Sequence, residues 1–114
     1  MSASAEIAVE SRGDHVVARV GGEVDVTNVA RVGAELMASI PNEALGLVID
    51  LAETRYLDSA GIELVFDMAR RLERRRQSLA LVVPPGSPLT RVLELTGVAT
   101  VAPLHHSVEA ALES

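Results

Sequence analysis

Alternating hydrophobic and polar residues at the start of the chain predict a β-hairpin. Ile7 and Val9 are separated by small or polar residues, and residues 16–20 form a second, more apolar run. Gly13 and Asp14, which lie between the two runs, are typical turn residues. We therefore expect two half-buried strands that pair through a tight turn.

After the hairpin, segments with apolar residues at helical spacing alternate with two short apolar runs. The runs at residues 45–51 and 79–83 are almost continuously hydrophobic, which is typical of strands buried on both faces of a parallel sheet. A third short run, at residues 98–101, predicts a last strand, and residues 52–57 read as a loop. Turn and cap residues then delimit four helices: from Thr27 or Asn28 to Pro41, from Asp58-Ser59 to near Arg76, from an N-cap at Ser87 and a first residue at Pro88 to Gly97, and from Ser107 through Leu112.

These elements follow one another in the order β-β-α-β-α-β-α-β-α. Strands that alternate with helices need crossover connections, and right-handed crossovers produce a mainly parallel sheet with helices packed on it. The chain therefore predicts an α/β fold with a mixed, mostly parallel sheet of about four to five strands. The hairpin supplies an antiparallel edge.

Composition limits the functions that this fold can serve. The 114 residues suit a single domain, residues 1–114, and 48% of them are hydrophobic, with no cysteine for disulfide bonds or thiolate metal sites. A net charge of −6 argues against affinity for nucleic acid or anionic membranes. Residues 1–7 lack the pattern of a secretory signal, and no apolar run approaches membrane-spanning length, so we expect a cytoplasmic protein.

The segment 56–62, with sequence YLDSAGI, is the strongest candidate for a functional site. It follows a buried strand and opens a helix, where open α/β sheets tend to place their ligands. Ser59 lies at or beside the N-cap, and Gly61 carries no side chain that would keep another backbone away. The same Asp-Ser pair is also an ordinary helix cap, and both interpretations stay open on the local pattern.

The wider pattern resembles the STAS domain of bacterial anti-sigma factor antagonists. The resemblance covers almost the whole chain, and its most specific parts are the Asp-Ser-x-Gly element at residues 58–61 and the Gly-Glu-x-Asp element at residues 22–25. It implies that Ser59 is phosphorylated by an anti-sigma factor that is itself a serine kinase, and dephosphorylated by a serine/threonine phosphatase. It also implies that the unphosphorylated form binds the anti-sigma factor and so releases the sigma factor. Ala60 departs from the many relatives that carry Ser or Thr there, which leaves a single acceptor.

The resemblance and the helix pattern give a partner-binding surface around Ser59. We expect it to include Asp58, Ala60, Gly61 and Ile62 beside the serine, together with three more distant residues: Asp25, Leu64 and Met68. Asp25 also suits a turn carboxylate. Leu64 and Met68 fall at the solvent edge of the apolar stripe, where core packing is an equally good explanation.

Three other chemical readings of the sequence are weaker. The arginine-rich run at residues 70–76 suits a helix C-terminus, where Asp67 can pair with Arg70 or Arg71, better than a nucleic-acid site. His105 and His106 are adjacent and have no third metal ligand nearby in the sequence, so we expect neither a metal nor a cofactor. Asp50 closes a buried strand, where a carboxylate usually caps a loop.

Two other functions remain as alternatives. The first is a serine hydrolase, which the missing Gly-x-Ser-x-Gly element disfavours, so we expect no enzyme activity. The second is a STAS domain that serves as a scaffold in a stress-signalling complex or as a lipid-transport accessory, without serine phosphorylation. A fold alone does not exclude the second alternative.

Overall fold

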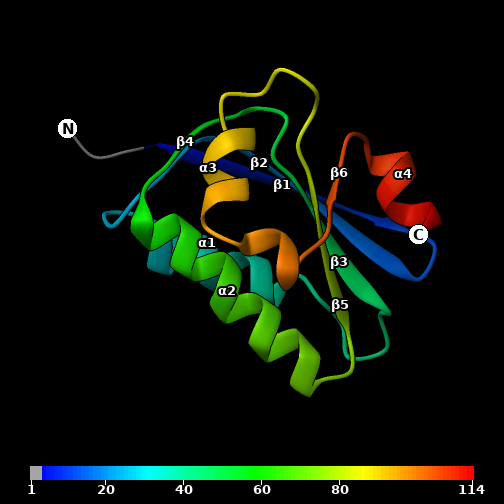
Figure 1. Cartoon of the computed structure of the whole chain (residues 1–114). Helices are drawn as coiled ribbons and strands as arrows, with labels where there is room; N and C mark the ends of the chain where they lie inside the picture. The colour runs from blue at the N-terminus through cyan, green and yellow to red at the C-terminus, as the bar shows by residue number, and fades with distance from the viewer. Residues whose placement is uncertain (1–3) are drawn as a thin grey trace.

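The computed structural model describes residues 4–114. The first three residues, which belong to the segment examined for a secretory signal and to the expected domain, lie outside the described part. The elements, labelled in Figure 1, are β1 (Ala5–Arg12), β2 (His15–Val24), α1 (Val29–Ala38), β3 (Gly46–Asp50), β4 (Thr54–Leu57), α2 (Ser59–Arg74), β5 (Ser78–Val82), α3 (Thr90–Leu95), the short 3₁₀ helix η1 (Val98–Thr100), β6 (Leu104–His105) and α4 (Val108–Glu113).

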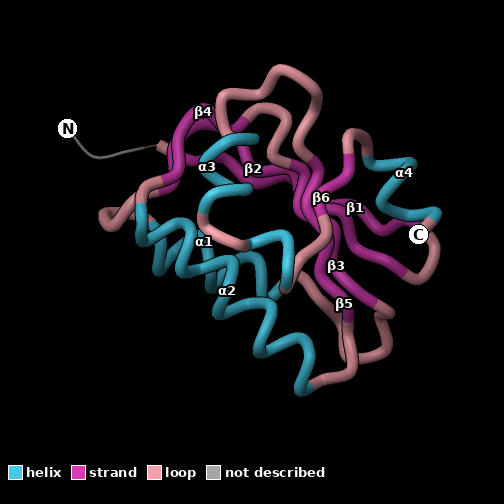
Figure 2. Tube along the Cα trace, viewed as in Figure 1, coloured by secondary structure: helices cyan, strands magenta, loops and turns pink. Residues whose placement is uncertain are grey.

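The strands form one mixed sheet in the order β1-β2-β3-β5-β6, with β4 paired to the far end of β2. β1 and β2 are antiparallel and meet through the predicted turn at Gly13 and Asp14, whereas the other pairs are parallel. The sheet twists through the middle of the molecule, as the tube in Figure 2 shows. The predicted α/β class, with an antiparallel hairpin at the edge of a parallel sheet, is confirmed.

Helices cover both faces of the sheet, unequally. α1, α2 and α3 contribute to the larger core on one face, whereas α4 packs on the opposite face against β3, β5 and β6 (Figure 1). Every residue of β3 is buried, as its continuous apolar run predicts. Successive residues of β3 alternate between the two cores, with Leu47 and Ile49 in the larger and Val48 in the smaller.

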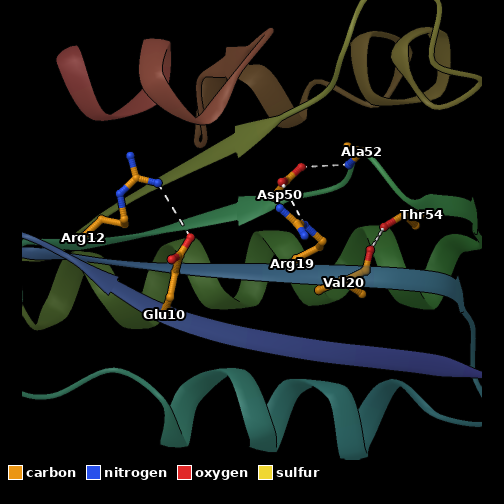
Figure 3. A network of polar contacts seen from close by, with 7 residues as sticks. All are labelled: Glu10, Arg12, Arg19, Val20, Asp50, Ala52 and Thr54. Atoms are coloured by element: carbon orange, nitrogen blue, oxygen red, sulfur yellow. Dashed lines mark hydrogen bonds and ion pairs between the residues drawn. The ribbon is translucent and has the colours of Figure 1, made fainter.

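β4 is the strand that the sequence did not reveal, because residues 52–57 read as a loop. It has only four residues, and only Thr54 and Leu57 at its two ends are buried, so no period-two alternation marks it. Long-range hydrogen bonds hold it instead: the Thr54 hydroxyl donates to the carbonyl of Val20, and the Gly22 N–H donates to the Glu53 carbonyl at 3.0 Å. Figure 3 shows the Thr54–Val20 bond.

Two boundaries in the last third of the chain were predicted wrongly. Residues 98–101 are not a strand: Val98–Thr100 forms η1, and the last strand is Leu104–His105. A four-residue apolar run cannot by itself distinguish a strand from a buried helical turn. α3 begins at Thr90 and not at Pro88, because the Ser87 hydroxyl accepts from the N–H of Leu89 at 3.1 Å and closes a separate turn.

Thr54→Val removes the hydroxyl that ties β4 to β2 and leaves the buried Val20 carbonyl short of a donor. We expect a loss of about 1–3 kcal/mol in the free energy of unfolding, measured by denaturant titration. The matched control, Thr54→Ser, keeps the hydroxyl and loses one buried methyl group, worth about 0.8 kcal/mol. A valine variant at least as stable as the serine variant contradicts this account of β4.

Candidate functional site

The start of α2 places Ser59 on the surface. Asp58 is the N-cap, with an extended backbone, and its Oδ1 accepts from the Gly61 N–H at 3.1 Å. Ser59 is therefore the first helical residue and is exposed. Within residues 4–114, its hydroxyl has no hydrogen-bond partner. The side chain is open to a visiting protein, at the end of the helix where the macrodipole favours negative charge.

The loop between β2 and α1 (residues 25–28) has a defined shape beside this helix start. Asp25 Oδ1 accepts from both the backbone N–H and the hydroxyl of Thr27, the former at 2.8 Å. The Asp25 N–H donates to Asn28 Oδ1 at 3.0 Å, and Asn28 Nδ2 donates to the Glu23 carbonyl at 2.9 Å. Asn28 occupies the predicted N-cap position of α1, but its side chain stabilises the loop and does not cap the helix.

The loop changes the acidity of Asp25. The hydrogen bonds from the Thr27 hydroxyl and backbone stabilise the ionised carboxylate and lower the pKa of Asp25 from its usual value. Asp25 is therefore a turn carboxylate, as one of its two interpretations predicts, and its contact with a partner stays a prediction.

Asp58 connects this loop to α2. Its Oδ2 accepts from the Val26 N–H at 3.1 Å, while the Asp58 N–H donates to the Val24 carbonyl at 3.2 Å. Val26 is 73% exposed, so an apolar side chain lies on the surface beside the helix start. Val26 is not among the residues predicted from the sequence, although an apolar residue between Asp25 and Thr27 in a polar turn is a detectable signal.

The first turn of α2 lies unusually close to the end of β2. A Cβ atom added at Gly61 would lie 3.2 Å from both the Val24 carbonyl oxygen and Leu57 Cδ2. Gly61 and Ile62 are buried, so of the predicted partner-binding residues these two support the surface from below and do not form it. The space that we expected Gly61 to leave for a partner is filled by the protein's own strand.

A groove of about 490 Å³ runs between α1 and α2, from Ala60 beside the serine to Arg71. Leu64 is half-buried and borders this groove, where its Cδ1 lies 2.8 Å from the position of a Cβ atom added at Gly33. Met68 is only 1% exposed, so our placement of Met68 toward solvent is wrong. Since α1 packs on this flank of α2, the buried arc of the helix extends farther round than a single stripe suggests.

The weaker chemical candidates have structural roles. Asp50 Oδ1 accepts from the Ala52 N–H at 2.9 Å, which confirms the loop-capping interpretation, and its Oδ2 pairs with Arg19 Nε at 3.4 Å (Figure 3). Asp67 pairs with Arg70 and Arg71, as the spacing predicts. Among residues 4–114, no three His, Cys, Asp or Glu side chains are grouped to hold a metal ion. No helix in that part of the chain is long and apolar enough to cross a membrane.

Comparison with known proteins gives a consistent result. A family model described as the STAS domain matches residues 6–111. The anti-sigma-B factor antagonist of Listeria monocytogenes is 35% identical over 88 residues, which cover 77% of this chain and 76% of that protein.

Solved structures share the fold at lower identity. An anti-sigma factor antagonist from Mycobacterium paratuberculosis superposes with a TM-score of 0.84 at 24% identity, over 96% of this chain and 92% of that one. The anti-sigma factor antagonist SpoIIAA in its unphosphorylated form gives a TM-score of 0.75 at 23% identity, over 95% and 94% of the two chains. At these identities the structures support the fold alone.

Gly61→Ala places a methyl group against the Val24 carbonyl, a backbone atom that cannot move without disturbing β2. We expect a loss of about 1–2 kcal/mol in the free energy of unfolding. The matched variant is Gly33→Ala, whose new methyl group meets the flexible end of Leu64 and gains up to about 1 kcal/mol of helix propensity. Chemical denaturation of both variants is the test, and equal stability of the two refutes the tight contact at Gly61.

Thr27→Val removes the hydroxyl that stabilises the Asp25 carboxylate. We expect the pKa of Asp25 to rise toward its usual value, as followed by NMR titration of the carboxyl carbon. Because the folded-state pKa is lowered, the stability that this carboxylate contributes is present at neutral pH and is lost as the pH falls through that pKa. A pKa of Asp25 that is the same in both proteins contradicts the assigned cause.

Proposed function

The chain belongs to the STAS domain family, and we propose that it is an anti-sigma factor antagonist controlled by phosphorylation of Ser59. In its unphosphorylated form it binds an anti-sigma factor, a serine kinase, and so frees the sigma factor. Phosphorylation by that kinase ends the interaction, and a serine/threonine phosphatase restores it. The observation that supports this function most directly is the exposed Ser59 hydroxyl at the first position of α2.

The local energetics favour control of binding over control of folding. A phosphate group adds roughly −1.5 to −2 charges, which the helix N-terminus stabilises by about 0.3–1 kcal/mol. The Asp58 carboxylate beside it opposes the phosphate, by about 1 kcal/mol for each pair of unit charges about 4 Å apart in bulk water. Since Ser59 is exposed and has no packing to lose, these small terms leave the fold intact.

An interface that covers Ser59 responds differently. Val26 gives the surface an apolar contact next to the serine, and a partner that buries it also removes water from Ser59. Burying an unpaired phosphate there costs several kcal/mol, on the order of a hundredfold or more in affinity at about 1.4 kcal/mol per tenfold. The same surface therefore accepts a hydroxyl and rejects a phosphate.

Two features support regulation over catalysis. The Ser59 hydroxyl has no histidine among its hydrogen-bond partners in the described chain, whereas a serine nucleophile needs an adjacent base. The Listeria relative is named as a regulator and not as a hydrolase. A scaffold role without phosphorylation remains the second candidate, and the modification state of Ser59 separates it from the first.

Ser59→Asp mimics part of the phosphate charge at the helix start. We expect affinity for the cognate anti-sigma factor, measured by calorimetry, to fall at least tenfold, with a melting temperature within a few degrees of the unsubstituted protein. The control is Ser11→Asp, which adds the same charge at an exposed position of β1. We expect no change in affinity for that variant. Equal affinity for the Ser59→Asp and unsubstituted proteins would falsify the switch.

The phosphorylation site itself is tested by mixing the protein with candidate anti-sigma kinases and ATP. Mass spectrometry is expected to find one phosphate, at Ser59, and none in the Ser59→Ala variant. A phosphate at another residue contradicts the assignment. The absence of transfer from every kinase that binds the protein favours the scaffold role.

A further inference from the structure

Asp58 contacts two separate elements through its two carboxylate oxygens. Oδ1 accepts from Gly61 N–H in the first turn of α2, and Oδ2 accepts from Val26 N–H in the loop 25–28. A helix cap needs only the first of these bonds. The second bond crosses from residue 58 to residue 26 and needs its own explanation.

We propose that Asp58 is a positioning residue, which holds the loop 25–28 against α2 so that Val26 and Ser59 face the same partner. The proposal rests on the proposed function for the identity of that partner, an anti-sigma factor. It assigns to Asp58 a role beyond helix capping, and it assigns to Val26 a direct contact with the partner.

The hydrogen bond from the Val26 N–H to Asp58 Oδ2, called the tether below, is needed because Val26 is exposed. With 73% of its surface exposed, the Val26 side chain has little packing of its own that would fix its direction. Its position is therefore set by its backbone, and the Val26 N–H is the group that Asp58 holds at 3.1 Å. An exposed apolar side chain with a fixed direction is pre-organised for binding, because less conformational entropy is lost when the partner covers it.

The other hydrogen bonds of the loop have a different effect. The Thr27 N–H donates to the Asp25 carboxylate, and the Asp25 N–H donates to the Asn28 side chain. Asn28 in turn donates to the Glu23 carbonyl, so these bonds all lie within the segment 23–28. They define the internal shape of the loop. The bond from the Val26 N–H to Asp58 fixes the position of the loop relative to α2. It therefore also fixes the loop relative to Ser59, the next residue in the chain.

A serine at position 58 separates the two roles of Asp58. Ser107 caps α4 in this same chain by accepting from the Ala110 N–H at 3.1 Å, so a serine hydroxyl makes the capping bond in this fold. A single hydroxyl oxygen cannot replace both carboxylate oxygens. Asp58→Ser therefore keeps the cap and removes the tether to Val26.

The first measurement is amide hydrogen exchange by NMR on the full chain, without any partner. In Asp58→Ser we expect exchange of the Val26 amide to be at least fivefold faster, while the Gly61 amide keeps its protection. A second variant, Asp58→Asn, covers the case in which serine destabilises the helix. The asparagine Oδ1 can accept from the Gly61 N–H, but the amide nitrogen cannot accept from the Val26 N–H. Unchanged exchange at Val26 in both variants overturns the tether.

The second measurement is affinity for the anti-sigma factor. We expect Asp58→Ser and Val26→Ala each to weaken binding about tenfold, and the double variant to be no weaker than about tenfold, because both changes remove the same contact. A purely structural role of Asp58 predicts losses that multiply, and that result overturns the proposal. If the unsubstituted protein binds no anti-sigma factor, the proposed function fails, while the exchange data still decide whether Asp58 tethers the loop.

Discussion

The close approach of the first turn of α2 to the end of β2 is the contact on which the candidate site depends. The Asp58 N–H donates to the Val24 carbonyl, and Gly61 leaves no room for a side chain over the same carbonyl. The helix therefore starts directly beside the strand and the loop that follows it. This geometry brings Ser59 and residues 25–28, which are far apart in the sequence, to one surface.

Three polar side chains around this surface are held by hydrogen bonds within the protein, whereas the Ser59 hydroxyl has no hydrogen-bond partner among residues 4–114. Asp25 is held by Thr27, Asp58 by Val26 and Gly61, and Asn28 by the loop backbone. The serine hydroxyl takes part in none of these bonds, so a group attached to it changes the surface without removing any of them. A switch that acts on binding needs such an arrangement.

The sequence predicts the elements whose signal is local, and it fails where distant contacts determine the structure. The hairpin and α2 carry clear periodicity, β3 and β5 are nearly continuous apolar runs, and all four elements are present. β4 is too short to alternate, and it exists because Thr54 reaches the carbonyl of Val20. η1 and β6 were misplaced because the run at residues 98–101 is equally compatible with a buried turn and a strand.

The same division applies to the site. The position of Ser59 at a helix start follows from its neighbours in the sequence, as does the capping role of Asp58. The burial of Met68 depends on the packing of α1 against α2, and the contact of Val26 with Asp58 spans 32 residues, so local pattern reveals neither.

The most direct test of the central claim compares the protein before and after enzymatic phosphorylation at Ser59. The two quantities are the affinity for the cognate anti-sigma factor and the melting temperature, measured on the same samples. The account predicts a loss of affinity of about a hundredfold with a melting temperature that changes by only a few degrees. A melting temperature that moves by more than ten degrees while the affinity stays the same contradicts it.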